Sequence, residues 1–230
     1  MQRVPEPELM DEETQARAYS EADFQAPHEH FVDLLCASLP GQPAALTGPV
    51  LDLGCGPADV TVRVATRCPR VVVHGVDGSA AMLALGEARV REARLSSRVV
   101  LSLALLPRDR PPLAQYPVVI SNSLLHHLHD PAALWTTVKT FGAAGGHLFI
   151  MDLLRPPDVS EVERLVALHT RGEPAILVRD FHASLCAAFT ADEVRTQLEH
   201  AGLAQLKVEV VSDRHLTISG ALPHPHGATS

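Results

Sequence analysis

The chain has 230 residues, of which 46% are hydrophobic, and its formal net charge at pH 7 is −8. This length fits one domain with additions, and the apolar fraction excludes a mainly disordered chain. The negative charge argues against binding to nucleic-acid phosphates, and no apolar run reaches the ~18–20 residues that cross a bilayer.

Residues 1–45 are acidic, and the stretch from Pro7 to about Leu39 favours helices before a loop that contains proline and glycine. Five short apolar runs follow, at 49–53, 71–76, 99–103, 118–121 and 147–151. They barely alternate between apolar and polar residues, which is typical of strands buried on both faces. Stretches that favour helices separate the runs, at 58–66, 79–92 and 131–142. This alternation predicts right-handed crossovers and a parallel, doubly wound sheet.

The last third of the chain has a different pattern. A capping box at Ser160 predicts a helix to about Thr170, and a second one begins at Thr190 and leads to a helix that ends at Gly202. The final two apolar runs, 207–211 and 215–219, are joined by only three residues, which is too short for a parallel crossover. We therefore expect a seven-stranded sheet whose last strand is inserted antiparallel.

A glycine loop follows the first predicted strand. Gly54, Cys55 and Gly56 precede a helix, and glycines let the backbone turn tightly and approach a ligand closely. The helix N-terminus offers unpaired N–H groups to an anionic group. Asp77 ends the second strand, where a carboxylate can accept both hydroxyl protons of a ribose. A glycine pair alone is often just a turn, but this combination indicates a nucleotide-type site.

Two classes of cofactor suit this geometry. A dinucleotide site requires a third glycine, and Asp59 occupies that position, where its carboxylate would repel a pyrophosphate. Asp52, two residues before the first glycine, is also foreign to the dinucleotide pattern. Both carboxylates suit a cationic ligand that carries an amino acid group, such as S-adenosylmethionine.

Four segments carry a resemblance to a known family. Residues 50–57 (VLDLGCGP) look like motif I of the class I S-adenosylmethionine-dependent methyltransferases, and 75–79 (GVDGS) resemble the next motif. Residues 121–131 resemble the motif of the fourth strand in the small-molecule branch, of methyltransferase type 11/12, and Gly145-Gly146 resemble the motif before the fifth. The resemblance covers about residues 45–220. It implies a Rossmann-like α/β fold and an N-terminal helical lid.

The domain organisation that this implies has three parts. Residues 1–45 form the helical lid, 46–220 form the domain that binds S-adenosylmethionine, and 221–230 form a flexible tail.

The resemblance also implies a set of cofactor-binding residues. One departure is that the family often has an acidic residue after the third strand for the adenine amino group, whereas this chain has apolar residues at 103–107. We expect Met82 and Leu105 to pack on the adenine instead. The full set is Tyr19, Asp52, Gly54, Cys55, Gly56, Asp77, Gly78, Ser79, Met82, Leu105, Ser121 and Asn122.

Candidate catalytic residues follow the fourth and fifth strands, at the edge where open α/β sheets bind ligands. His126 or His127 can remove a proton from the methyl acceptor, with Asp152 on the adjacent strand end. The alternative is that these histidines only pack against the sheet or cap a helix. We predict no metal site, because no cysteine or glutamate near the histidines in the sequence completes a ligand set.

Other residues are candidates for the acceptor site. Asp23 and Phe24 belong with Tyr19 to the lid, and Arg155 follows the fifth strand. His182 lies in an insertion before the last helix, and such insertions often close over substrates; the alternative is a solvated loop.

We therefore predict an enzyme of small-molecule biosynthesis that transfers a methyl group to a nitrogen, oxygen, sulfur or selenium atom by in-line displacement. One alternative is an imidazole N-methyltransferase of an ovothiol-like thiohistidine or selenohistidine pathway. Another, of a different class, is a catalytically inactive subunit that binds the cofactor. We expect a monomer or homodimer without nucleic-acid or membrane partners. The four isolated cysteines and the absence of an apolar signal segment favour the cytoplasm.

Overall fold

The fold was analysed in a computed structural model that describes residues 1–9, 11–41 and 43–224. The elements run in chain order as α1 Glu13–Glu21, α2 Gln25–Ser38, η1 Pro43–Ala45, β1 Gly48–Leu53, α3 Asp59–Arg67, β2 Val71–Asp77, α4 Ala80–Glu92, β3 Val99–Leu103, β4 Tyr116–Asn122, η2 Leu125–His127, α5 Ala132–Phe141, β5 Gly142–Leu153, α6 Val159–His169, α7 Ala175–Ala187, α8 Ala191–Ala201, β6 Lys207–Val210 and β7 His215–Ala221. The label η marks a short 3₁₀ helix.

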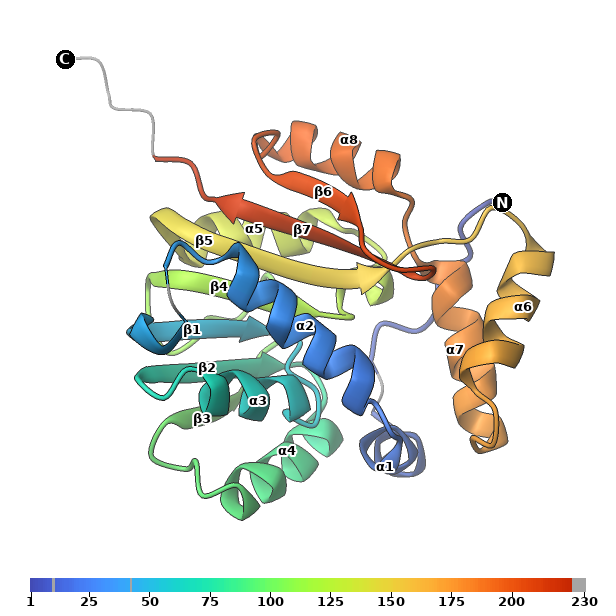
Figure 1. The fold of residues 1–230 in the computed structure, drawn as a ribbon, viewed down its shortest axis with the longest axis horizontal. Helices are drawn as coiled ribbons and strands as arrows, with labels where there is room; N and C mark the ends of the chain where they lie inside the picture. The colour runs from blue at the N-terminus through green and yellow to red at the C-terminus, as the bar shows by residue number, and fades with distance from the viewer. Residues whose placement is uncertain (10, 42, 225–230) are drawn as a thin grey trace.

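The described strands form one sheet in the order β3-β2-β1-β4-β5-β7-β6 (Figure 1). β1 to β5 pair in parallel, and β7 pairs antiparallel with β5 on one side and with β6 on the other. This arrangement confirms the predicted seven-stranded sheet with an inserted antiparallel strand. The carboxyl ends of β1, β2, β4 and β5 all lie at the same edge of the sheet, on the side of α1 and α7 in Figure 1.

The two faces of the sheet are covered by different helices. On one face, α2 and α3 pack through side chains such as Phe31 and Val64 on the valines of β1, β2 and β4. On the other face, α5 and α8 pack through Trp135 and Leu198 on side chains such as Leu148. Because β1, β4 and β5 contribute to both clusters, their sequences are apolar on both faces, which explains the runs that identified them.

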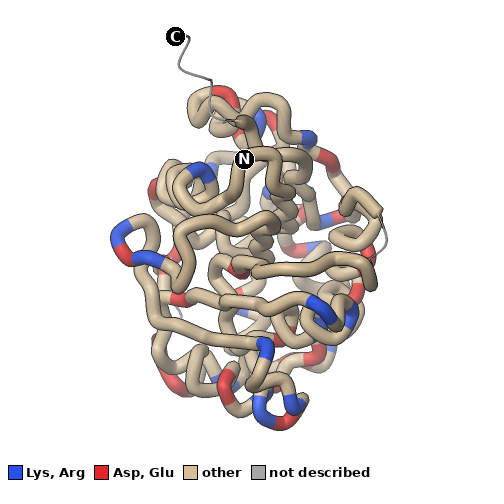
Figure 2. Tube along the Cα trace, turned by 90° about the vertical axis from the view of Figure 1, so that its left-hand side faces the viewer, with Lys and Arg blue, Asp and Glu red and all other residues tan. Residues whose placement is uncertain are grey.

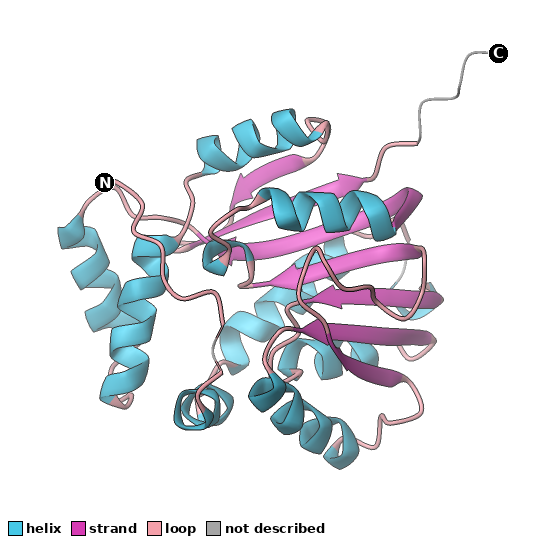
Figure 3. Cartoon of the chain, turned by 180° about the vertical axis from the view of Figure 1, so that it is seen from behind, coloured by secondary structure: helices cyan, strands magenta, loops and turns pink. Residues whose placement is uncertain are grey.

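The first nine residues form a strap, defined here as residues 1–9, that crosses the ligand-binding edge of the sheet (Figure 3). The Arg3 side chain donates to the carbonyl oxygens of Ala187, His126 and Leu128 at 2.5, 2.9 and 2.9 Å, and stacks over Phe189 with its Cζ atom 4.0 Å from the ring centre. The strap thus joins the end of α7 to η2.

Three local expectations differ from the structure. The cap of α6 is Asp158, whose carboxylate accepts the N–H of Glu161 at 2.9 Å, so the predicted capping box at Ser160 was wrong. His182 lies within α7 instead of a loop. β7 extends through Ala221, which is one residue inside the predicted tail, and the tail residues 225–230 lie outside the described part of the chain.

No helix in the described part of the chain is long and apolar enough to cross a membrane. Basic and acidic residues are interspersed along the same segments of the chain (Figure 2).

The capping box of α8 supplies a test of the packing on that face. Thr190 Oγ1 accepts the N–H of Glu193, and the Glu193 carboxylate accepts the N–H of Thr190. We expect Thr190→Ala to lower the free energy of unfolding by about 1 kcal/mol, measured by urea denaturation. Thr196→Ala, on the exposed side of the same helix, serves as the control and should be neutral or slightly stabilising, because alanine favours helices. Equal losses in the two variants would contradict the capping assignment.

Candidate functional site

The glycine loop between β1 and α3 is built around a close contact. Gly54 has φ +70° and Gly56 has φ +51°, a region that L-residues with a side chain rarely adopt. A Cβ atom at Gly54 would lie 2.8 Å from a Leu124 methyl carbon, so the loop can only approach the segment after β4 because glycine is there.

Asp77 fixes this loop from the end of β2. One carboxylate oxygen accepts the N–H of Gly56 and the other accepts the N–H of Ser79, both at 2.8 Å. Burial raises the pKa of Asp77, although these backbone N–H groups act in the opposite direction. Each oxygen keeps a further lone pair for a ligand hydroxyl. Ser79 in turn caps α4 by accepting the N–H of Met82 at 3.2 Å.

Asp52 lies beneath the loop and is only 1% exposed. Its carboxylate accepts the Thr61 hydroxyl at 2.6 Å. Burial raises the pKa of Asp52 to about 7, and the negative charge of Asp77 adds to the rise, although the hydrogen bond from Thr61 opposes it. The carboxyl group is therefore close to its protonation midpoint at neutral pH, and a cation in the cavity above it would favour the charged form.

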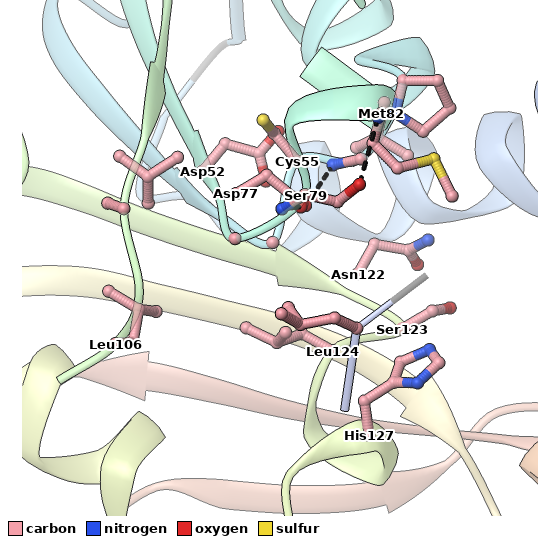
Figure 4. Close-up of a pocket in the computed structure, with 18 of the residues that line it drawn as sticks. Asp52, Cys55, Asp77, Ser79, Met82, Leu106, Asn122, Ser123, Leu124 and His127 are labelled. Atoms are coloured by element: carbon pink, nitrogen blue, oxygen red, sulfur yellow. Dashed lines mark hydrogen bonds between the residues drawn. The ribbon is translucent and has the colours of Figure 1, made fainter. Parts of the chain in front are cut away.

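The first cavity lies over the glycine loop. Figure 4 shows Asp77 and Ser79 grouped together, Ser123 and His127 across from them, and Asn122 in between. The Asn122 Oδ1 atom is buried and has no hydrogen-bond partner among the described residues. The lining residues are Glu8, Leu9, Tyr19, His28, Asp52, Gly54, Cys55, Gly56, Pro57, Asp59, Val60, Val76, Asp77, Gly78, Ser79, Met82, Ala104, Leu105, Leu106, Asn122, Ser123, Leu124, His127 and Leu128.

A second cavity adjoins the first at the ends of β4 and β5. Its walls combine apolar side chains, among them Phe24, Met151 and Phe181, with polar ones such as Asp180 and His215. Both cavities share the lining residues Tyr19, His28, Asn122, Ser123 and His127. A ligand in the first cavity and a second molecule in the other would therefore meet beside these shared residues.

His126 is held by a buried carboxylate. Its Nδ1 atom lies 2.6 Å from Asp152 Oδ1, and the other Asp152 oxygen accepts the N–H of Leu125 at 2.7 Å. Burial opposes charge on both residues, but the pair outweighs it: the pKa of His126 is raised and the pKa of Asp152 is lowered. Because an ionised carboxylate only accepts, Nδ1 carries the proton and Nε2 faces away from Asp152.

His127 is the neighbour of His126, with ring centres 4.2 Å apart. Burial lowers the pKa of His127 to about 3, and the positive charge of His126 adds to this effect. The ring is therefore neutral at physiological pH. Its Nδ1 atom is buried without a hydrogen-bond partner among the described residues.

The helix α2 is tied to the start of α3 by an ionic contact. His28 Nδ1 lies 2.6 Å from Asp59 Oδ2, which also accepts Arg63 Nε at 2.7 Å. Burial opposes ionisation of Asp59, but these two partners outweigh it and lower the pKa of the carboxyl group well below its usual range. Asp59 thus has a structural partner that the sequence reading did not identify.

Most of the expected site residues lie around the two cavities. The first cavity contains every proposed cofactor residue except Ser121, whose hydroxyl donates to the Leu53 carbonyl within the sheet. The second contains Asp23, Phe24, His126 and His127, with Asp152 behind His126.

Two expected substrate residues line neither cavity. Arg155 is 8% exposed and is paired with Glu193 at 2.6 Å, so its charge is used between β5 and α8. His182 lies on α7 beside Cys186, with Nδ1 3.9 Å from the sulfur.

Sequence reasoning missed lining residues in two segments. Glu8 and Leu9 come from the strap, whose position depends on contacts with residues more than 100 positions away. Ser123 and Leu124 follow β4, and Ser123 has φ +56°. Their position directly after a strand that ends in Ser-Asn was the only feature of the sequence that pointed to Ser123 and Leu124 as lining residues.

Comparisons with known proteins agree with this geometry. A family model described as a methyltransferase domain matches residues 51–148. The chain is similar to the 27-O-demethylrifamycin SV methyltransferase of Amycolatopsis mediterranei, with 28% identity over 71% of this chain and 56% of that protein. A trans-aconitate 2-methyltransferase of Variovorax paradoxus is 35% identical over 44% of this chain and 37% of that protein. The chain thus spans about half the length of the curated relatives it matches.

Solved structures share the fold. A putative S-adenosylmethionine-dependent methyltransferase of Methanococcus maripaludis superposes with a TM-score of 0.68 at 12% identity, over 98% of this chain and 99% of that one. The plantazolicin methyltransferase BpumL, in complex with a triazolic desmethylPZN analogue and SAH, superposes with a TM-score of 0.69 at 11% identity, over 92% of this chain and 90% of that one. Identities this low establish the fold, which is that of the class I methyltransferases.

The raised pKa of Asp52 predicts a pH-dependent penalty on folding. The unfolded chain loses the Asp52 proton near pH 4 and the folded chain only near pH 7, so ionisation costs folding free energy between these values. We expect Asp52→Asn to become more stable than the parent as pH rises from 4 to 8, by up to about 4 kcal/mol. Urea denaturation of both proteins at several pH values measures the difference between their free energies of unfolding. The other titrating groups are the same in both proteins, so their effects cancel in this difference. A difference that does not change with pH would contradict the assignment.

Proposed function

We propose that this chain is a class I S-adenosylmethionine-dependent methyltransferase and that it transfers the sulfonium methyl group of S-adenosylmethionine to an oxygen atom of a small molecule. The observation that carries the proposal is the unpartnered, buried Asn122 Oδ1 atom, which lines the first cavity together with Asp77. A cavity with a ribose acceptor and an orphan amide oxygen fits a nucleoside that also carries an ammonium group.

The residues of the first cavity supply complementary contacts. Asp77 is held rigidly by Gly56 and Ser79, so its remaining lone pairs are oriented for the two ribose hydroxyls. Asn122 and Asp52 lie where they can face the ammonium end, and Met82 and Leu105 provide apolar contact for the adenine. The cofactor, once bound, would supply a methyl group activated by its positive sulfonium, and the neutral thioether of S-adenosylhomocysteine would be the leaving group.

An oxygen acceptor is favoured over the other nucleophiles by the relatives. Their names include the 27-O-demethylrifamycin SV methyltransferase and an O-methyltransferase of ubiquinone biosynthesis in Acinetobacter baumannii. The second cavity supports an acceptor with an apolar body, because Phe24, Met151 and Phe181 line it. Its polar residues can orient the reacting group near the cavity's junction with the first.

We assign His126, His127 and Asp152 to the acceptor end of the site. His126 and His127 line the second cavity, and Asp152 holds the His126 ring in one orientation. The role that this geometry supports is positioning of the reacting group of the acceptor within reach of the methyl carbon, since a well-oriented nucleophile gains most of the available rate.

The first 45 residues act as a lid in this proposal. Tyr19 and His28 of α1 and α2 line both cavities, and the strap contributes Glu8 and Leu9 to the first. A segment that covers both ligands excludes water when it is in place. The four cysteines are all free thiols, which supports a reducing, cytoplasmic setting.

Cofactor binding is the direct test of the proposal. We expect the parent protein to bind S-adenosylhomocysteine in calorimetry and Asp77→Asn to bind it about 10–150-fold more weakly, because one charged acceptor of the ribose hydroxyls is lost. Thermal melting of the variant checks that the glycine loop still folds. Unchanged affinity in Asp77→Asn, or preferential binding of NAD by the parent, would overturn the proposal.

The lid is tested through one aromatic side chain. The ring centres of Tyr19 and Phe24 are 4.7 Å apart, and burial raises the pKa of the Tyr19 phenol to about 12, so this group is neutral at all working pH values. We expect Tyr19→Ala to weaken cofactor binding and turnover together by roughly tenfold, because the lost contact area is about that of a small apolar group. Tyr19→Phe, which keeps the ring, should retain most of both. If the alanine variant behaves like the parent, the segment is not a lid.

A further inference from the structure

We propose that Glu6, His126 and His127 bind a divalent transition-metal ion of the zinc or iron(II) class at the wall of the acceptor cavity. The three residues come from the strap and from η2, which lie 120 positions apart in the sequence. The proposal deepens the proposed function, on whose acceptor site it rests, but metal binding itself can be measured without that activity.

The ligand atoms converge on one point. Glu6 Oε1 lies 3.6 Å from His126 Nε2 and 3.4 Å from His127 Nδ1, and all three atoms lie within 4.8 Å of one another. Bonds of about 2.1 Å to one ion place two ligand atoms about 3.0–3.4 Å apart. The Glu6 oxygen thus already stands at nearly ligand spacing from both nitrogens.

Two of these three atoms lack other partners. Glu6 Oε1 and His127 Nδ1 are buried and make no hydrogen bond to any described residue. Their contacts with one another are too long to be hydrogen bonds. A buried acceptor oxygen beside two ring nitrogens costs folding free energy unless a cation or a donor satisfies it, and a metal ion satisfies all three atoms at once.

Both imidazoles turn a ring nitrogen toward Glu6, and an ion that binds there displaces any proton from that nitrogen. Asp152 accepts the Nδ1 proton of His126 at 2.6 Å, which leaves Nε2 to the ion and reproduces the carboxylate–histidine–metal arrangement of natural sites. On His127, the unpartnered Nδ1 faces Glu6, and the ring interacts with the backbone of Pro7. Asp152 thus does not contact the ion, but its hydrogen bond to His126 fixes the orientation of the ring.

The donor set selects the kind of ion. Two imidazoles and one carboxylate suit zinc, iron(II) or cobalt(II), whereas magnesium and calcium prefer oxygen ligands alone. Three protein ligands leave at least one coordination position open. Because His126 and His127 line the second cavity, an ion held there could bind an acceptor oxygen as a Lewis acid.

The first experiment is a titration of the chelator-treated 230-residue protein with Zn²⁺, followed by calorimetry, and with Co²⁺, followed by its visible absorption. We expect one tight site per chain. Asp152→Asn, which removes only a hydrogen-bond partner of a ligand, should lower the metal affinity about 10–100-fold. Glu6→Gln and His127→Gln, which each remove a ligand, should lower it by more than that. Mg²⁺ should neither bind to the site nor displace Co²⁺.

The matched control is His200→Gln, which removes an exposed histidine of α8 and should leave the tight site unchanged. Glu6→Gln is isosteric and lies in the strap outside the core, so thermal melting should show that the variant is folded. The proposal is overturned if the parent has no tight site, or if Glu6→Gln and His127→Gln keep the parent's affinity.

Calorimetry with S-adenosylhomocysteine separates this proposal from the proposed function. Loss of the metal in Glu6→Gln should leave cofactor affinity within about threefold of the parent, while turnover of any identified acceptor falls. A protein that binds Zn²⁺ through the triad but does not bind S-adenosylhomocysteine would refute the proposed function alone. A protein that binds S-adenosylhomocysteine but no metal would refute the metal site alone.

Discussion

The contact on which the rest of the site depends is the pair of hydrogen bonds from the backbone of Gly56 and Ser79 to the two oxygens of Asp77. One carboxylate thereby joins the loop after β1 to the cap of α4, across two neighbouring strands. Parallel pairing of β1 with β2 and with β4 brings the ends of these strands to one edge, so Asp77, the glycine loop and Asn122 surround the same space. The requirement for glycine at position 54 follows from the same crowding, since Leu124 of the segment after β4 occupies the place of a side chain.

The sequence allowed good prediction of whatever depends on local pattern. Apolar runs located the strands because β1, β4 and β5 are buried on both faces, and the three-residue link before β7 required antiparallel pairing. The first cavity lies where the order of strand, glycine loop, helix and Asp77 indicated a ligand site, and cofactor binding there stays a prediction. Partners that are distant in sequence could not be predicted. Arg155 follows the fifth strand, where the sequence indicated a residue that binds the substrate. In the structure it lines neither cavity, because its guanidinium group is paired with Glu193. The cap of α6 is Asp158 because its carboxylate accepts the N–H of Glu161, which starts the helix at Val159 and leaves Ser160 inside it. Glu6 reaches His126 only through the folded strap, and no spacing in the sequence encodes that.

Charge in the interior is arranged around the two histidines of η2. Asp152, fixed by the backbone of Leu125 and Leu153, favours the charged form of His126, and that charge together with burial keeps His127 neutral. Adjacent, similar side chains thus differ in protonation because only His126 makes a hydrogen bond to the Asp152 carboxylate. At the start of α3, Asp59 contacts His28 of α2 and Arg63 of its own helix. The contact with His28 joins α2 to α3. Ionic contacts of this kind, buried and hydrogen-bonded, orient elements more than they stabilise them.

The strap has a consequence for the order of assembly on the ribosome. Arg3 and Val4 dock on the backbone of Ala187 and Cys186, more than 180 positions later in the sequence, so they find their place only after that later part has been synthesised. During that interval the β1–β4 half can already pair, since its contacts are nearer in sequence, while Glu6 remains in water. The strap is then buried later than the sheet that follows it in the sequence, and its docking requires that the end of α7 is already in place.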